Sequence, residues 1–464
     1  MSILDQPTDT VAIIGGGPAG LATARALKTV GLPFVLFEKH RDVGGIWDRE
    51  NAGSPMYRSA HFISSRTMSG HEGYPMPDSF PDYPSNGQIL SYIQDFAADF
   101  GLYDHIRLNT PVDRVTKDGD GWVVQSSAEG QPRSERFRWL VCASGTNWHP
   151  NRPAIKGEET FTGEIVHSVA YDGSDSLKGQ RVLVVGAGNS GVDIACDAAF
   201  AADEAYTSMR RGYHFVPKHI FGQPADVFGS KSSWMPMWLT QLVFGGLLRQ
   251  LNGDLTRLGL QKPDHKIFES HPIMNTQVLH YLQHGDLIAK PDLDRLEGED
   301  AVFSDGSRAA IDLVILATGY NWTLPYLDDG LFEWKNNRPQ TFLKIFNPDQ
   351  PSLFVNGYIE TNSGAYKLFD EMGLLIAQTI AAQARDPAKA RQIQATIEGP
   401  EPNLGGKVAY VESARHTGYT NVTAYTKAMK AMRDQLGWPD PSAFYEAAPK
   451  AAPSPAQGIA SEAA

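Results

Sequence analysis

The sequence has little cysteine, no excess of basic charge and no metal-ligand pattern. Its 464 residues include two cysteines, Cys142 and Cys196, which are too few for a disulfide framework and form no CxxC redox pair. Lys and Arg number 41 against 53 Asp and Glu, so the formal net charge is −12. That sign disfavours nucleic acid as a partner. The 13 histidines lack metal-ligand spacing, so we expect no metal site.

Signals for export and for crossing a membrane are also missing. Residues 1–10 lack the basic start and the apolar core of a signal peptide. The longest apolar run, Trp234–Leu248, has 15 residues, whereas a bilayer-spanning helix needs about 20. We therefore expect a cytoplasmic protein without a transmembrane segment. An apolar helix over Met237–Leu251 is most simply a lid or core element near a substrate entrance. Contact with a membrane surface or with a homodimer partner is the alternative.

Glycine, in contrast, is abundant and clustered. The chain has 44 glycines, where average usage of about 7% predicts roughly 32. One cluster, GGGPAG at Gly15–Gly20, lies between an apolar strand, Val11–Ile14, and a helical stretch. A second apolar strand, Phe34–Phe37, ends in Glu38. This order is typical of a Rossmann unit, in which the glycines let the backbone approach a pyrophosphate at the helix N-terminus.

The same order returns in the middle of the chain. A strand at Val182–Val185 leads into GAGNSG at Gly186–Gly191 and a second helix. The next strand, Ala205–Met209, is followed by Arg210-Arg211. Strands that alternate with helices predict an α/β fold with parallel sheets and right-handed crossovers.

The residues after the second strands distinguish the two nucleotides. Glu38 can accept hydrogen bonds from ribose hydroxyls, which suits FAD or NAD. The equivalent place in the second unit holds Arg210 and Arg211 and no acid. Because guanidinium groups pair with phosphate, we expect NADPH in the second unit.

The segments around these units are less regular. Asn51–Asn86 is rich in Pro, Ser, Gly and Tyr and is predicted to be loop. Three short apolar runs predict a small antiparallel layer, at Val112–Val115, Trp122–Gln125 and Phe137–Val141.

A fingerprint between the two units resembles that of a known family. Phe161–Tyr171 matches FxGxxxHxxxY, the pattern of class B flavin-containing monooxygenases. GGIW at Gly44–Trp47 and ATGY at Ala317–Tyr320 are similar to further family motifs, and all stand in the family's order. The resemblance covers about residues 10–320 and is looser beyond them.

The resemblance implies two Rossmann-like dinucleotide-binding domains, with the NADPH domain inserted into the FAD domain. The expected FAD domain comprises residues 1–172 and 315–446. The expected NADPH domain spans 173–314, with a helical insertion at about 213–285. Residues 447–464 are rich in Ala, Pro and Ser and are predicted to be a disordered tail.

It also implies an NADPH- and O2-consuming monooxygenase that acts on a small molecule through a C4a-hydroperoxyflavin. The protein then supplies orientation and exclusion of water rather than a nucleophile or base. By the same resemblance, the residues expected to contact FAD are Gly15, Gly17, Ala19, Gly20, Glu38, Ile46 and Trp47. Those expected to contact NADPH are Asn189, Ser190, Gly191, Arg210 and Arg211.

Two fingerprint positions bear on the reaction. His167 could act as a general acid or base, but the resemblance implies a structural or domain-motion role at an interdomain linker. Baeyer–Villiger enzymes usually have Trp where this chain has Tyr171. That difference favours oxygenation of soft nucleophiles such as amines and sulfides. A Baeyer–Villiger monooxygenase, which converts ketones to esters, is the alternative.

The sequence departs from the family pattern near the flavin, and two other functions are alternatives. Many family members have an Asn near the flavin, where this chain has Ile63-Ser64-Ser65. A flavin disulfide reductase is disfavoured because CxxC is missing. A dinucleotide sensor without catalysis is a further alternative. In such an enzyme, one or two side chains of the substrate pocket set the specificity.

Overall fold

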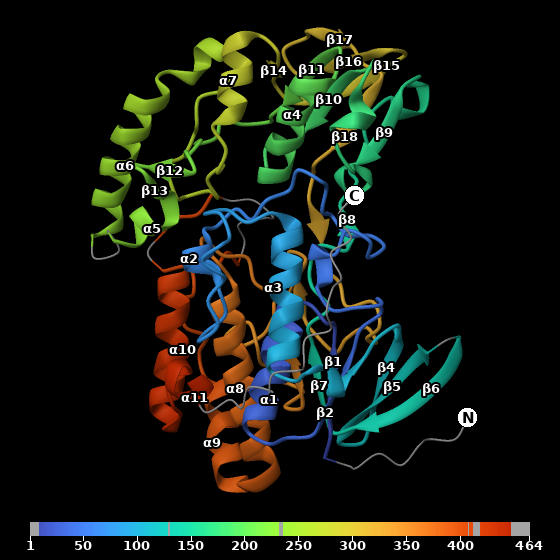
Figure 1. Ribbon diagram of the computed structural model, residues 1–464, viewed down its shortest axis with the longest axis vertical. Coiled ribbons are helices and arrows are strands. Elements are labelled where there is room, and N and C mark those ends of the chain that lie inside the picture. The colour runs from blue at the N-terminus through green and yellow to red at the C-terminus, as the bar shows by residue number, and fades with distance from the viewer. Residues whose placement is uncertain (1–8, 129, 232–234, 407, 412–417, 447–464) are drawn as a thin grey trace, which may run out of the picture.

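Two parallel five-stranded sheets lie in different halves of the molecule along its long axis (Figure 1). The computed structural model describes residues 9–128, 130–231, 235–406, 408–411 and 418–446. The tail predicted at 447–464 lies outside them. The first sheet has the order β22-β7-β1-β2-β3. Its strands are β1 (Val11–Ile14), β2 (Phe34–Phe37), β3 (Ile106–Arg107), β7 (Trp139–Cys142) and β22 (Leu353–Val355).

The second sheet has the order β14-β11-β10-β18-β9, and its neighbouring strands are also parallel. Its strands are β9 (Glu164–His167), β10 (Arg181–Val185), β11 (Glu204–Ser208), β14 (Ile288–Lys290) and β18 (Leu313–Leu316). After β18 the chain returns to the first sheet through β22, which pairs with β7. The predicted α/β fold, with the second unit inserted into the first, is confirmed.

The residue boundaries of the domains stay a prediction. One strand differs from them, because β9 lies in the range expected for the first domain but pairs with β18 of the second sheet. The fingerprint therefore contains a strand of the second sheet, and the chain continues from it into β10 of the same sheet.

Helices cover the first sheet and bury one large apolar core. Figure 1 shows α1 (Pro18–Thr29), α3 (Asn86–Asp99) and α8 (Tyr366–Arg385) running alongside one another. Leu21 of α1, Ile93 of α3 and Leu375 of α8 are fully buried in this core. Further helices of this part are α2 (Arg66–Ser69), α9 (Pro387–Ile397), α10 (Val422–Leu436) and α11 (Pro441–Glu446).

The second sheet carries α4 (Asn189–Ala201) and α7 (Gln277–His284), and the predicted insertion contains α5 (Ala225–Ser230) and α6 (Met237–Asn252). Phe244 and Leu248 of α6 are buried, whereas Trp238 and Leu242 are 66% and 67% exposed. In the described part of the chain, no helix is long and apolar enough to cross a membrane.

The predicted antiparallel layer is present, but one of its strands was placed wrongly. It consists of β4 (Val112–Asp118), β5 (Gly121–Ala128) and β6 (Gln131–Phe137). The run Phe137–Val141 is not one strand. Phe137 ends β6, and Trp139 begins β7, whose four residues are all buried in the first sheet. Two strands of different sheets can therefore follow each other within one apolar run of the sequence.

The remaining strands of the described part of the chain lie outside the two large sheets and the antiparallel layer. They are β8 (His149–Pro150), β12 (His219–Ile220), β13 (Gln223–Pro224), β15 (Leu293–Glu297), β16 (Asp300–Phe303), β17 (Arg308–Ala310), β19 (Tyr320–Asn321), β20 (Trp334–Lys335) and β21 (Arg338–Pro339).

Candidate functional site

The first glycine cluster forms a tight turn between β1 and α1. Gly15 has φ +111°, and a Cβ there would lie 2.5 Å from the Ala143 carbonyl oxygen. A Cβ at Gly20 would lie 1.9 Å from the Gly15 carbonyl oxygen. These positions require glycine, because only a bare backbone allows α1 to start so close to the strand ends. The turn brings the helix N-terminus, which attracts anions, to the carboxyl edge of the sheet.

Glu38 follows β2 and holds this turn. Its side chain is nearly fully buried, and Oε2 accepts a hydrogen bond from the Gly16 amide at 2.6 Å. Oε1 accepts from the His40 amide at 2.8 Å. Burial raises the pKa of Glu38, while the two amide bonds act in the opposite direction. The carboxylate therefore lies at the strand end where a ribose is expected, with a fixed orientation.

Two later segments close over the turn. The Gly44 amide donates to the Gly16 carbonyl at 3.1 Å. Ile46 and Trp47 follow in a 3-10 turn, and the Trp47 ring meets Phe62 edge-on at 5.1 Å between centroids. Gly357, after β22, lies so near that its Cβ would be 2.8 Å from the Cβ of Ala19. These residues form a glycine-lined cradle, and its chemistry fits the pyrophosphate of FAD.

The second glycine turn repeats this geometry. A Cβ at Gly186 would lie 2.4 Å from the Ala317 carbonyl oxygen, and one at Gly191 would lie 2.3 Å from the Gly186 carbonyl oxygen. Asn189, the first residue of α4, accepts the Met274 amide at 3.0 Å through Oδ1. Its Nδ2 lies 3.3 Å from His271 Nε2. Ser190 is exposed beside it. The turn fits a second dinucleotide.

The two arginines that follow β11 are not equivalent. Arg210 is exposed. Arg211 forms an ion pair with Asp264, 3.0 Å away, from the segment between α6 and α7. The structure thus places both guanidinium groups after the second strand, as the sequence predicts, but a carboxylate already neutralises one of them.

His167 ends β9 and uses both of its ring nitrogens. Nε2 lies 3.0 Å from the Gly319 carbonyl oxygen, and Nδ1 accepts the Val169 amide at 3.2 Å. The ring is therefore neutral, with its proton on Nε2. Burial lowers the pKa of His167, which the bond to Gly319 partly offsets. This arrangement supports a structural role, because neither nitrogen is available for proton transfer with a substrate.

The segment that replaces the family Asn contacts the insertion. Ile63 is 39% exposed and carries no polar group. The Ser65 amide donates to Asp226 Oδ2 of α5 at 2.7 Å. Sequence analysis did not identify Asp226, since it lies 161 positions away from Ser65.

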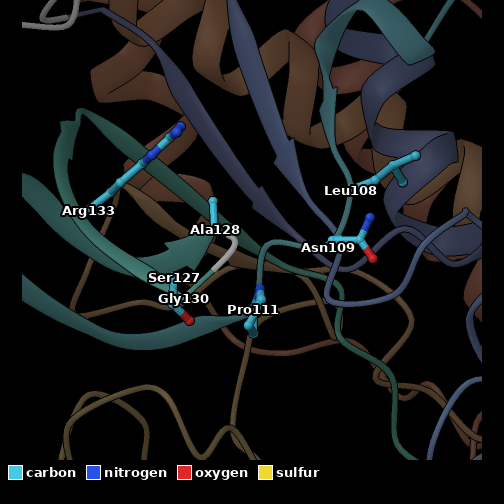
Figure 2. Close-up of a pocket in the computed structure, with 7 residues that line it drawn as sticks. All are labelled: Leu108, Asn109, Pro111, Ser127, Ala128, Gly130 and Arg133. Atoms are coloured by element: carbon cyan, nitrogen blue, oxygen red, sulfur yellow. The ribbon is translucent and has the colours of Figure 1, made fainter.

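An open pocket lies beside the antiparallel layer rather than at either glycine turn. Figure 2 shows Leu108 and Arg133 on opposite sides of it. Its lining residues are Leu108, Asn109, Pro111, Ser127, Ala128, Gly130 and Arg133. It contains no residue of the predicted sites. Among the described residues, no cluster of His, Cys, Asp or Glu could hold a metal ion.

Comparison with known proteins agrees with this geometry. The model of the flavin-binding monooxygenase-like family matches residues 8–437. The human flavin-containing monooxygenase 5 is 30% identical over 447 residues, which cover 92% of this chain and 82% of that protein. A probable indole-3-pyruvate monooxygenase of Arabidopsis thaliana, YUCCA9, is 30% identical over 398 residues, covering 83% and 92%.

Solved structures show the same fold. An oxidized steroid monooxygenase bound to NADP superposes with a TM-score of 0.69 at 18% identity and covers 92% of this chain and 97% of that one. The S-allyl-L-cysteine S-oxygenase from Allium sativum gives 0.64 at 20% identity, covering 94% and 91%. Because the family match spans nearly the whole chain, the protein belongs to the flavin-binding monooxygenase-like family, which confirms FAD and NADPH as its cofactors and NADPH-dependent monooxygenation as its class of reaction.

Proposed function

We propose that this enzyme oxygenates soft nucleophiles, at the nitrogen of amines or the sulfur of sulfides. The observation that carries the proposal is Tyr171 at the end of the fingerprint, where Baeyer–Villiger enzymes usually have Trp. Tyr171 is 5% exposed, and its hydroxyl donates to Asp197 Oδ2 at 2.8 Å. The Tyr171 hydroxyl thus has a specific hydrogen-bond partner in addition to the packing of its ring.

The described residues suit a reaction in which the protein positions the cofactors and the substrate and shields them from water. Bound FAD, once reduced by NADPH, supplies oxygen transfer, so that NADPH, a proton, O2 and substrate give NADP+, water and the oxygenated substrate. A sulfide or tertiary amine attacks through its own lone pair and needs no base. His167, whose two nitrogens are both hydrogen-bonded, is therefore a positioning residue in this account.

We assign the two cofactors to the two glycine turns. The first turn, with Glu38 after its second strand, would hold FAD through Gly15, Gly17, Ala19, Gly20, Glu38, Ile46 and Trp47. The second, with a guanidinium at the equivalent place, would hold NADPH through Asn189, Ser190, Gly191, Arg210 and Arg211. The matching backbone geometry of the turns supports both assignments.

The substrate class is tested with a panel. Purified protein is given NADPH and, separately, a thioether, a tertiary amine, indole and a cyclic ketone, and the products are identified by mass. We expect a sulfoxide or an N-oxide in proportion to the NADPH consumed and no ester. Ester from the ketone, without sulfoxide or N-oxide, would establish the Baeyer–Villiger alternative.

The cytoplasmic location and the homodimer stay predictions. The exposed Trp238 and Leu242 of α6 support a surface that associates with another molecule. Light scattering on a size-exclusion column gives the mass in solution, and cell fractionation gives the compartment.

A further inference from the structure

Helix α4 of the second domain carries two carboxylates that bind residues of the first domain. Asp193 and Asp197 are four residues apart and therefore share one face of the helix. Figure 1 shows α4 at the junction of the two domains, above α3. The helix starts at Asn189, directly after the second glycine turn. A contact that fixes this face also fixes the position of that turn.

Asp197 binds two segments at once. Its Oδ2 accepts hydrogen bonds from Ser59 Oγ at 2.6 Å and from the Tyr171 hydroxyl at 2.8 Å. Ser59 belongs to the loop that leads from the first glycine cradle to α3, and Tyr171 is the last residue of the fingerprint. One carboxylate oxygen thus connects the second domain with both the first domain and the linker.

Asp193 repeats the contact one turn earlier. Its Oδ2 accepts from the Tyr57 hydroxyl at 3.1 Å, and its Oδ1 accepts from Asn275 Nδ2 at 2.6 Å. The rings of Tyr57 and Tyr171 lie 5.6 Å apart, and both side chains are buried. Burial raises the pKa of Asp193, while the hydrogen bonds from Asn275 and Tyr57 act in the opposite direction. The hydrogen bonds and the ring contact together connect α4 with Tyr57 and Tyr171.

The loop is arranged to make these contacts. Tyr57 and Ser59 are two residues apart and both reach α4, whereas Arg58 between them reaches the linker. The Arg58 amide donates to the Asp172 carbonyl at 2.8 Å, and its guanidinium lies 2.7 Å from the Asp172 carboxylate. Three consecutive residues of the first domain therefore bind the linker or the second domain.

We propose that Asp193 and Asp197 are positioning residues of an interdomain clasp, made with Tyr57, Ser59 and Tyr171. The clasp sets where the NADPH-binding turn lies relative to the FAD cradle, and it rests on the assignment of NADPH to the second turn. Positioning matters because a misplacement of about 1 Å costs roughly 100-fold in the rate of a reaction between bound groups.

The contact with Tyr171 gives the sharpest test. Tyr171→Phe keeps the buried ring and removes only the hydroxyl, and Asp197→Ala removes the acceptor. The control is Asp203→Ala, an exposed aspartate just beyond the end of α4. Ser59→Ala is a second clasp variant on a small, exposed side chain and does not disturb the core. FAD content and melting temperature establish that each variant is folded.

The readouts are the limiting rate of anaerobic flavin reduction by NADPH, the Kd of NADPH, and amide hydrogen exchange over residues 56–60 and 168–173. We expect Tyr171→Phe and Asp197→Ala to slow reduction about tenfold with less than about a threefold change in Kd. Exchange over both segments should rise. The double variant should be no slower than the slower single variant, because both remove the same bond.

Unchanged reduction rates and unchanged exchange in all three clasp variants would overturn the proposal. An equal effect of Asp203→Ala would do the same, because the loss of negative charge near the C-terminal end of α4 would then be the cause. None of these three readouts needs the substrate that is oxygenated, so a wrong substrate class leaves this test intact. Wild-type flavin that NADPH does not reduce would refute the cofactor assignment and the clasp with it.

Discussion

His167 and Gly319 are joined by a hydrogen bond, in which Nε2 of the imidazole donates to the glycine carbonyl at 3.0 Å. The bond connects the fingerprint strand β9 with the segment where the chain leaves the second sheet after β18. The chain enters the second sheet at β9 and leaves it after β18. His167 therefore joins the two segments that connect the domains. Only the neutral, Nε2-protonated imidazole keeps this bond together with the one from the Val169 amide.

The first prediction concerns pH. Burial holds the pKa of folded His167 below the ordinary 6.5, so the unfolded chain binds more protons below that pH. Its contribution to the free energy of unfolding is therefore present above about pH 6.5 and is lost as the pH falls. His167→Gln keeps a hydrogen-bond donor but has no titrating ring. We therefore expect its free energy of unfolding to fall less than that of wild type when the pH is lowered.

Urea denaturation between about pH 5 and pH 8 measures this difference. Burial also lowers the pKa of His105 and His214, but these residues are present in both proteins and cancel. If the free energy of unfolding changed with pH in the same way for wild type and variant, His167 would not be held neutral.

The second prediction separates the two arginines. Arg210→Ala should raise the KM for NADPH by about tenfold or more, because a lost bond between charged groups costs roughly 1.5–3 kcal/mol. The KM for NADH should change little. Arg211→Ala should have a smaller effect, because Asp264 already pairs with that guanidinium. Steady-state kinetics with both nucleotides measure this. Equal rises for NADPH and NADH would refute a role in binding the 2′-phosphate.

The third prediction concerns the first turn. Gly20→Ala places a Cβ 1.9 Å from the Gly15 carbonyl oxygen, so the turn must open. We expect the free energy of unfolding to fall by about 1–3 kcal/mol and the purified protein to contain less FAD. The matched control is Gly87→Ala on α3, where a Cβ would meet nothing within 4 Å. The FAD absorbance per protein measures the outcome. Equal FAD content in both variants would contradict the claim that the cradle binds FAD.

The fourth prediction concerns a buried ion pair beneath the first cradle. Arg25 of α1 and Asp370 of α8 lie 2.8 Å apart and are almost fully buried. Burial alone would raise the pKa of Asp370, but His71, Arg25 and the Glu72 amide outweigh it and hold the pKa below its usual range. Asp370→Asn removes the counter-ion of the buried guanidinium and should lower the free energy of unfolding by roughly 3–5 kcal/mol.

An exposed pair is the control for this change. Asp434 of α10 lies 2.9 Å from Lys430, and both side chains are more than half exposed. Asp434→Asn should change the free energy of unfolding by less than about 1 kcal/mol. Denaturant titration of both variants measures the contrast, and similar losses would show that burial does not strengthen the Arg25 pair.

The sequence predicted the parts of the fold that local pattern determines. The strands β1 and β2 have the predicted bounds, because each is a short apolar run that ends at a clear turn. The two-residue strand β3 was missed, since so short a segment has no period. The run Phe137–Val141 was misread because apolarity does not say which sheet a strand joins.

The predicted cofactor contacts followed from motifs, whereas the contacts between domains did not. Ser59 and Asp197 are 138 positions apart, and Arg211 and Asp264 are 53 apart. No spacing rule connects such residues, because the pairing depends on how two complete domains meet. The available signal was the pair Asp193 and Asp197, four residues apart on α4, and a solvated helix face explains such a pair equally well.

The most direct test of the central claim follows both oxygen atoms of O2. The enzyme is given NADPH, oxygen-18-labelled O2 and a thioether, and the products are weighed by mass spectrometry. We expect a sulfoxide with one labelled oxygen, the other label in water, and one NADPH consumed for each sulfoxide. NADPH consumption that yields only hydrogen peroxide with every sulfide and amine offered, or a sulfoxide whose oxygen comes from unlabelled water, would contradict the account.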